Sequence, residues 1–135
     1  MASVLTVNTA AAPVDLGPMR SGIDKRPSAV PLSGRAPGPR KGGLGSGVVG
    51  DSVCNRRYHG GNDQAVYAYA REDLDRWESE LGRELANGTF GENLTTAGID
   101  VTASLIGEPW SVGSGGLVLE VVEAEHSGAQ LKHQT

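Results

Sequence analysis

Glycine and proline recur along this chain at intervals that leave little room for long helices. The 135 residues include 20 glycines and 7 prolines, and prolines stand at positions 27, 31, 37 and 39. Proline removes a backbone donor and breaks helix interiors, whereas glycine favours turns. Because the apolar runs between them are short and β-favouring, we expect a mainly β fold within one domain.

These short runs mark the expected strands. They lie at residues 3–8, 64–70, 90–96, 105–112 and 117–122. The glycine-rich run 113–116 predicts a hairpin between the last two strands. Brief edge pairing is also expected near residues 29–32. After residue 122 the sequence loses its apolar and polar contrast, so we expect a domain over 1–122 followed by a polar, disordered tail over 123–135.

One main helix is predicted over residues 71–82. Leu74, Trp77 and Leu81 repeat on one face of it, and we expect this stripe to pack against the core. Acidic residues near its start suit the helix dipole, and Gly82 stands where a C-terminal cap belongs.

Charge and cysteine content exclude several functional classes. The net charge is -4, and the basic residues lie mostly in the first 57 positions. Because they stand among prolines, we expect a solvated loop surface and no nucleic-acid polymer as partner. A single cysteine excludes an intrachain disulfide framework, and no apolar run reaches the roughly 20 residues of a membrane span. We therefore expect a cytoplasmic protein with no membrane partner.

The segment 45–50 satisfies the dinucleotide-binding pattern G-x-G-x-x-G as letters. That fingerprint needs a buried strand before it and a helix that begins at its last glycine, whereas prolines precede this segment and a polar stretch follows. We expect a flexible glycine loop there. The spacing of Cys54, His59, His126 and His133 fits none of the usual zinc ligand sets, so no metal site is expected from them.

Two glycine-bearing polar motifs, HGGND and FGEN, flank the predicted helix. His59 could act as an acid or base near neutral pH with Asp63 to orient it, or could tie a glycine turn together by hydrogen bonds. Glu92 and Asn93 could hold the polar edges of a heterocycle, or could bond the loop backbone. We expect His59 and the loop 88–95 to converge on one cleft.

Together these motifs resemble a known family. HGG-x-D-x-AVY, the L-x-x-W helix, G-x-FGENLT, IGE and LEV are similar to the MOSC domain, named from the C-terminal domain of molybdenum-cofactor sulfurase, and IDKRP at 23–27 is similar to its opening segment. The resemblance covers residues 3–122 and is nearest to stand-alone bacterial members. It implies a β-barrel of the pyruvate-kinase type with few helices.

The resemblance also implies a function. It implies binding of the molybdenum cofactor (molybdopterin), used for sulfur transfer or for reduction of N-hydroxylated compounds, in a family also associated with pyridoxal phosphate. The implied partners are a small-molecule ligand or cofactor, and a second copy of the chain or a redox partner protein. His59 is the candidate for catalysis, and the implied cofactor-binding positions are Lys25, His59, Gly60, Gly61, Asp63, Gly91, Glu92, Asn93 and Thr95.

The sequence departs from the family after its LEV strand. Family members continue into Pro-Arg-x-Pro-Cys, whose cysteine carries sulfur or ligates molybdenum, whereas residues 122–135 contain no proline, arginine or cysteine. Cys54 precedes HGG and does not follow LEV, so it does not simply replace that thiolate. We therefore expect a barrel truncated at its C-terminus, without persulfide transfer. Whether the chain is an enzyme stays open, and the alternative is a non-catalytic MOSC scaffold that binds a ligand or a partner.

Overall fold

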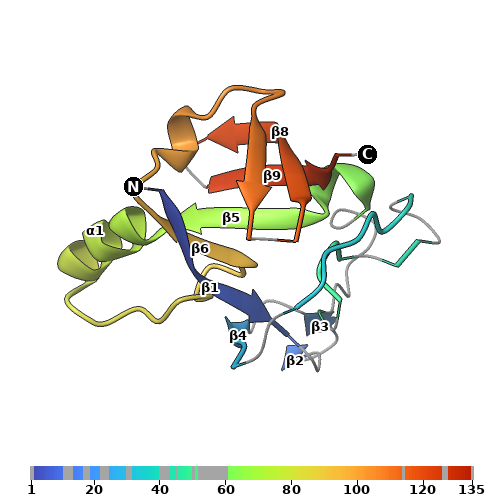
Figure 1. The fold of residues 1–135 in the computed structure, drawn as a ribbon. Coiled ribbons are helices and arrows are strands. Elements are labelled where there is room, and N and C mark those ends of the chain that lie inside the picture. Colours follow the sequence, from blue (N-terminus) through green and yellow to red (C-terminus); the bar gives the residue numbers. More distant parts are fainter. Residues whose placement is uncertain are drawn as a thin grey trace.

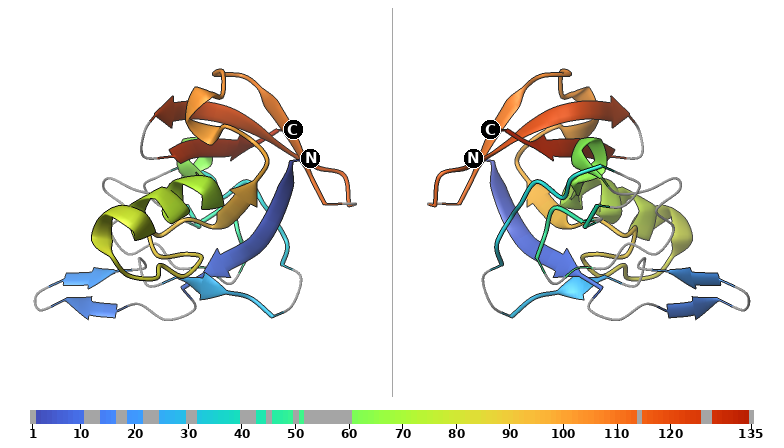
Figure 2. Two further views of the ribbon diagram at one scale, coloured as in Figure 1. Left: turned by 90° about the vertical axis from the view of Figure 1, so that its left-hand side faces the viewer. Right: turned by 90° about the vertical axis from the view of Figure 1, so that its right-hand side faces the viewer.

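Seven strands of the described chain form one sheet, in the order β4-β1-β6-β5-β9-β8-β7, which curls into a half-barrel (Figure 1). They are β1 (Ser3–Thr9), β4 (Arg26–Pro27), β5 (Val66–Ala70), β6 (Leu94–Ala97), β7 (Pro109–Val112), β8 (Leu117–Glu125) and β9 (Gly128–His133). The hairpin of β2 (Val14–Leu16) and β3 (Met19–Ser21) stands apart from this sheet (Figure 2). The expected mainly β fold is confirmed. The computed structural model describes residues 2–10, 14–16, 19–21, 25–29, 32–39, 43–44, 46–49, 51, 61–113, 115–125 and 128–134.

The strands β5 and β6 are the only parallel neighbours in the described sheet. Parallel neighbours need a crossover connection, and here it contains the helix α1 (Arg71–Leu81), which lies outside the curl (Figure 1). Because the two strands run in the same direction, the residues that precede them lie at the same edge of the sheet. The described part of the HGGND motif, residues 61–63, precedes β5, and the FGEN motif directly precedes β6.

The helix confirms the prediction over 71–82. Its first turn carries Glu72 and Asp73, and Gly82 closes it with φ 68° while its N–H donates to Glu78 O at 2.9 Å. Only part of the expected core stripe is buried, because Leu74 is 0% exposed whereas Leu81 is 53% exposed. The helix covers a small second cluster beside the sheet and not the interior of the curl.

Trp77 lies at the margin of that second cluster and remains 42% exposed. Its ring packs edge-on against Phe90 at 6.4 Å, and its Nε1 donates to the Tyr69 hydroxyl at 3.2 Å. Trp77 is therefore more than half buried, as expected, and it reaches the sheet through Tyr69 of β5.

The expected disordered tail over 123–135 is wrong for its described residues. β8 continues to Glu125, and β9 lies between β8 and β5 with Leu131 opposite both Val121 and Val66. Leu131 is 0% and Ala129 is 1% exposed. The sequence of this segment shows no apolar periodicity. It is nevertheless a strand, because it pairs with β8 on one side and with β5 on the other.

The region before β7 also differs from expectation. Strand structure begins only at Pro109, and residues 104–108 form a turn with Gly107 at φ 88°. Leu105 and Ile106 point outward from it, with exposed fractions of 75% and 79%. The hairpin of β7 and β8 is confirmed, with Trp110 opposite Leu119.

Two further segments are placed differently from the prediction. Residues 62–64 form a 3-10 turn, so the strand predicted from residue 64 begins at Val66. The pairing expected near 29–32 occurs on either side of it, in β4 and in an isolated bridge between Gly34 and Val48.

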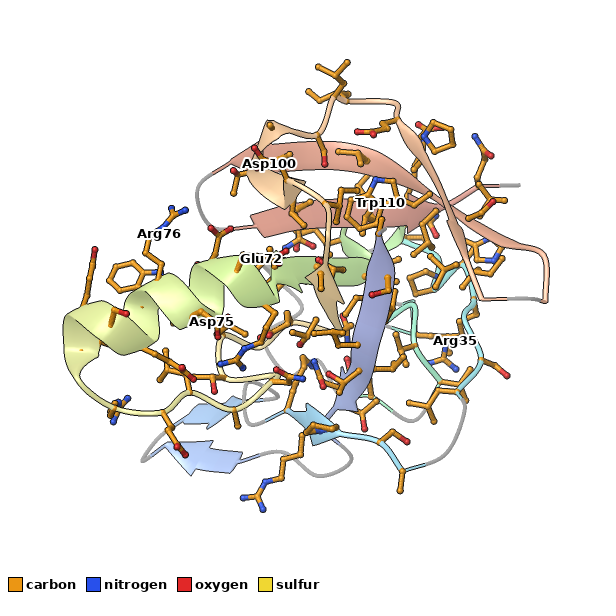
Figure 3. The ribbon with its side chains drawn as sticks, turned by 60° about the vertical axis from the view of Figure 1, so that its left-hand side comes forward. Arg35, Glu72, Asp75, Arg76, Asp100 and Trp110 are labelled. Carbon is orange, nitrogen blue, oxygen red and sulfur yellow. The ribbon has the colours of Figure 1, made fainter. Side chains whose placement is uncertain are left out.

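The core fills the inside of the curl. It is built from aliphatic residues of β5, β6, β8 and β9 together with Val101 and Trp110, which lies inside the curl in Figure 3. Four buried polar atoms of the described residues have no hydrogen-bond partner: Thr96 Oγ1, Ser104 Oγ, Trp110 Nε1 and His133 Nδ1. No helix in the described ranges is long and apolar enough to cross a membrane.

Candidate functional site

The carboxylate of Asp51 is the centre of a buried polar cluster. Lys25 Nζ donates to its two oxygens at 2.7 and 2.8 Å. The other donors among the described residues are Ala10 N–H at 2.8 Å, the Ser46 hydroxyl at 2.8 Å and Asn93 Nδ2 at 2.9 Å. Only 8% of the Lys25 side chain and 1% of the Asp51 side chain are exposed. Segments far apart in sequence therefore meet at one carboxylate.

Asn93 joins this cluster to the sheet. Its N–H donates to Tyr67 O at 2.8 Å, and its Oδ1 accepts from Tyr67 N–H at 3.1 Å. On its other side Asn8 N–H donates to Asn93 O at 2.7 Å, and Asn93 Nδ2 donates to Asn8 O at 3.3 Å. The asparagine thus extends the pairing of β1, β6 and β5 past the strand ends. The Asn93 side chain thus bonds backbone and Asp51, and its binding of a heterocycle stays a prediction.

The carboxylate of Glu92, which is 0% exposed, organises the loop before β6. Its Oε2 accepts from Gly88 N–H at 3.0 Å and from the Thr95 hydroxyl at 2.9 Å, and its Oε1 accepts from Phe90 N–H at 3.0 Å. Gly88 has φ 91°, and a Cβ there would lie 2.5 Å from Lys25 O, so glycine is needed for the loop to approach Lys25. Glu92 also bonds loop backbone.

Asn8 connects the two carboxylate centres. Its Nδ2 donates to Glu92 O at 3.0 Å and to Thr95 Oγ1 at 2.9 Å, and its Oδ1 accepts from the Thr6 hydroxyl at 2.8 Å. Asn8 and Thr95 are both 0% exposed. One continuous network therefore runs from Lys25 through the sheet edge to Glu92.

Arg71, at the start of α1, holds the segment between the helix and this network. It donates to Leu85 O and to Asn87 Oδ1, both at 2.8 Å, and it pairs with Asp75 and Glu78. Burial lowers the pKa of Arg71, but the hydrogen bonds to the two carboxylates outweigh burial and leave that pKa raised. The guanidinium thus stays charged and fixes residues 85–87 on the helix.

Four of the nine predicted cofactor-binding positions come together in this network, and Gly91, at φ 79°, lies in the loop that carries Glu92 and Asn93. Gly61 is buried at φ 83°, and Asp63 is exposed in the 3-10 turn before β5. His59 and Gly60 lie outside the described residues, as does Cys54. The predicted convergence of His59 with the loop 88–95 therefore stays a prediction.

The sequence reasoning missed Asp51, Asn8 and Ser46. The available signal for Asp51 was a carboxylate directly after a glycine-rich apolar run, and for Asn8 it was an amide at the end of a strand. Gly47 lies against Ala65, where a Cβ would come 2.6 Å from the alanine Cβ. Ser46, Gly47 and Val48 are buried, so the expectation of a flexible glycine loop is wrong for these three residues.

The described residues do not fit a molybdenum ligand set. The cluster offers carboxylate, amide and hydroxyl groups that already bond one another, whereas a molybdenum centre is suited by soft thiolate. In the described ranges no group of three or more His, Cys, Asp or Glu side chains could hold a metal ion.

The chain belongs to the MOSC domain family, because the model of that family, described as the MOSC domain, matches residues 55–134. The match extends through β9. The chain is also 44% identical over 59 residues to the uncharacterized protein YflK of Bacillus subtilis (strain 168). That alignment covers 44% of this chain and 27% of YflK, so it spans about a quarter of that protein's length.

Two solved structures share the fold. The crystal structure of YiiM from Geobacillus stearothermophilus is similar with a TM-score of 0.60 and 19% identity, over 100% of this chain and 76% of that one. The crystal structure of a hypothetical protein is similar with a TM-score of 0.57 and 22% identity, over 90% and 45% of the two chains. At these identities the likeness concerns the fold alone.

Proposed function

We propose that this chain binds the molybdenum cofactor, molybdopterin, at the segment bordered by Asp51 and Gly61. The observation that carries the proposal is the anchoring of both borders. Asp51 accepts hydrogen bonds from the Ala10 N–H and from the side chains of Lys25, Ser46 and Asn93. Gly61 is buried and precedes Asn62, which exchanges two hydrogen bonds of 2.9 Å with the backbone of Gly38. A ligand-binding segment needs such fixed ends, since binding sites are commonly loops on a rigid scaffold.

The residue types between these borders support the proposal. Residues 52–60 contain Cys54, Arg56, Arg57 and His59. Guanidinium groups recognise phosphate and imidazole exchanges protons near neutral pH. Cys54 does not stand at the position of the family's cysteine, but it is a thiol of the soft type that suits molybdenum. The bound cofactor would supply the redox chemistry, and the cluster around Asp51 would hold the segment in place.

A non-catalytic MOSC scaffold is the second candidate. It is favoured by one observation: the side chains of Lys25, Glu92, Asn93 and Thr95 are all bonded inside the protein. If residues 52–60 bind no cofactor either, only the scaffold role is left for this part of the chain. A second copy or a redox partner protein stays a prediction for both candidates.

The test is to purify the chain from cells that make molybdenum cofactor, and to measure molybdenum and pterin per chain. We expect both to be bound by the unchanged protein, and Cys54→Ser and His59→Ala to lower molybdenum content at least about tenfold. Arg83→Ala, at an exposed position after α1, is the control and should leave the content unchanged. A folded protein free of molybdenum and pterin would contradict the proposal and support the scaffold.

A further inference from the structure

Lys25 is enclosed at both of its ends. Its ammonium donates to both oxygens of Asp51, at 2.7 and 2.8 Å, and 8% of its side chain is exposed. Its carbonyl lies against Gly88, where a Cβ would come within 2.5 Å. The family resemblance implies that Lys25 binds cofactor, but these contacts direct the side chain into the protein.

The carboxylate that faces Lys25 is not free to move away. Asp51 also accepts from Ala10 N–H, from the Ser46 hydroxyl and from Asn93 Nδ2. For Lys25 to reach a bound ligand, its ammonium would have to leave a carboxylate whose side chain is 1% exposed without its counterion. Breaking a buried ion pair on one side is strongly unfavourable, because the remaining hydrogen bonds from neutral donors do not replace the lost counterion.

We infer that Lys25 is a positioning residue that acts through Asp51 and does not touch the ligand. Lys25 holds the carboxylate in place, and Asp51, which directly precedes residues 52–60 in the sequence, is thereby joined to Ala10, Ser46 and Asn93. The part of this inference that concerns the ligand rests on the proposed function. The pairing itself concerns the protein alone and is tested without ligand.

The first experiment uses the unchanged chain. Its three lysines are Lys25, Lys41 and Lys132. An amine-acetylating reagent should modify Lys25 at least about tenfold more slowly than Lys132, whose side chain is 40% exposed, and the difference should vanish in urea. Equal rates for the two lysines in the folded, cofactor-free protein would overturn the inference.

The second experiment is a double-mutant cycle of Lys25→Met, Asp51→Asn and their combination, with urea unfolding of cofactor-free protein. Each single change should lower the ratio of folded to unfolded protein at least about 100-fold, because each leaves one buried charge without its counterion. The double variant removes both charges, so it should be at least about tenfold more stable than additivity predicts. An additive result would overturn the inference. If a single variant does not fold, the double variant and the acetylation rates still decide.

Cofactor content of the same variants separates positioning from direct contact. Lys25→Met should lose molybdenum and pterin, and the double variant should regain a measurable part of both. A double variant that recovers stability but stays as depleted as Lys25→Met would show direct contact and overturn the inference. If the unchanged protein binds no molybdenum and no pterin, the proposed function fails, and the stability cycle alone decides the pairing of Lys25 with Asp51.

Discussion

Two adjacent threonines on β6 should respond to the same substitution with opposite signs. Thr95 is 0% exposed, and its hydroxyl accepts from Asn8 Nδ2 and donates to Glu92 Oε2, both at 2.9 Å. Thr96 is 2% exposed, points to the other face, and its hydroxyl has no partner among the described residues. Valine has nearly the shape of threonine and keeps its β-branching, so Thr→Val at each position isolates the hydroxyl.

The magnitudes follow from what each hydroxyl leaves behind. Thr95→Val leaves Asn8 and Glu92 each short of one buried hydrogen bond, and loss of one partner of a buried polar group costs about 1–3 kcal/mol. Thr96→Val removes an unpaired buried hydroxyl, whose desolvation costs a similar amount, so stability should rise by about 1 kcal/mol. In a domain of this size 1 kcal/mol corresponds to roughly 3–5 °C in Tm.

The assay is urea unfolding followed by circular dichroism, with thermal melts in parallel. Each variant serves as the matched control of the other, since sequence neighbourhood, strand and substitution are the same. We expect a lower urea midpoint for Thr95→Val and a higher one for Thr96→Val. Loss of stability in both variants would refute the reasoning about Thr96, and gain in both would refute the network around Thr95.

Three further changes test the site from other sides. Burial, with Asp73 and Glu92 nearby, raises the pKa of Tyr69 above 10.0, so the folded state keeps a proton that the unfolded chain releases. Stability should therefore fall as the pH rises above 10. The urea midpoint of Tyr69→Phe should not show this loss. Glu92→Gln replaces a carboxylate that accepts three hydrogen bonds by an amide with one acceptor oxygen, and should cost about 1–3 kcal/mol by urea unfolding, whereas an unchanged midpoint would contradict its role. Arg71→Lys should speed amide hydrogen exchange in residues 83–91 without unfolding β5. Lysine lacks the planar guanidinium that contacts Leu85 O and the two carboxylates at once. Unchanged exchange would contradict the role of Arg71 in holding this segment on the helix.

Local signals predicted the parts of the fold that are locally determined. The helix over 71–82 followed from its acidic start and from Gly82, and the hairpin of β7 and β8 followed from the glycines at 113–116. β9 was missed because its burial depends on pairing with β5, which lies far away in the sequence. Leu81 was expected in the buried stripe from periodicity alone, but it stands at the last residue of α1 and is 53% exposed.

The site was predicted in part. The FGEN motif drew attention to Glu92 and Asn93, and the resemblance added Lys25, but the roles of all three in a closed network were not visible. Asp51 is identified as a site residue only from the structure, in which Lys25 and Asn93 donate hydrogen bonds to it. The donors to Asp51 come from segments that are distant in sequence, so no fixed residue spacing marks them. The sheet, and not the separation along the chain, brings these donors within hydrogen-bond distance of the carboxylate.

The central place of β9 has a consequence for how the chain folds. β5 finds its parallel neighbour β6 within one crossover, but its other edge pairs with residues 65 positions later, as Val66 does with Leu131. At synthesis rates of about 5–20 residues per second, that edge stays unpaired for roughly 3–13 seconds. During this interval an apolar strand with open backbone groups is exposed to other chains, so the newly made protein should depend on chaperones more than its size suggests.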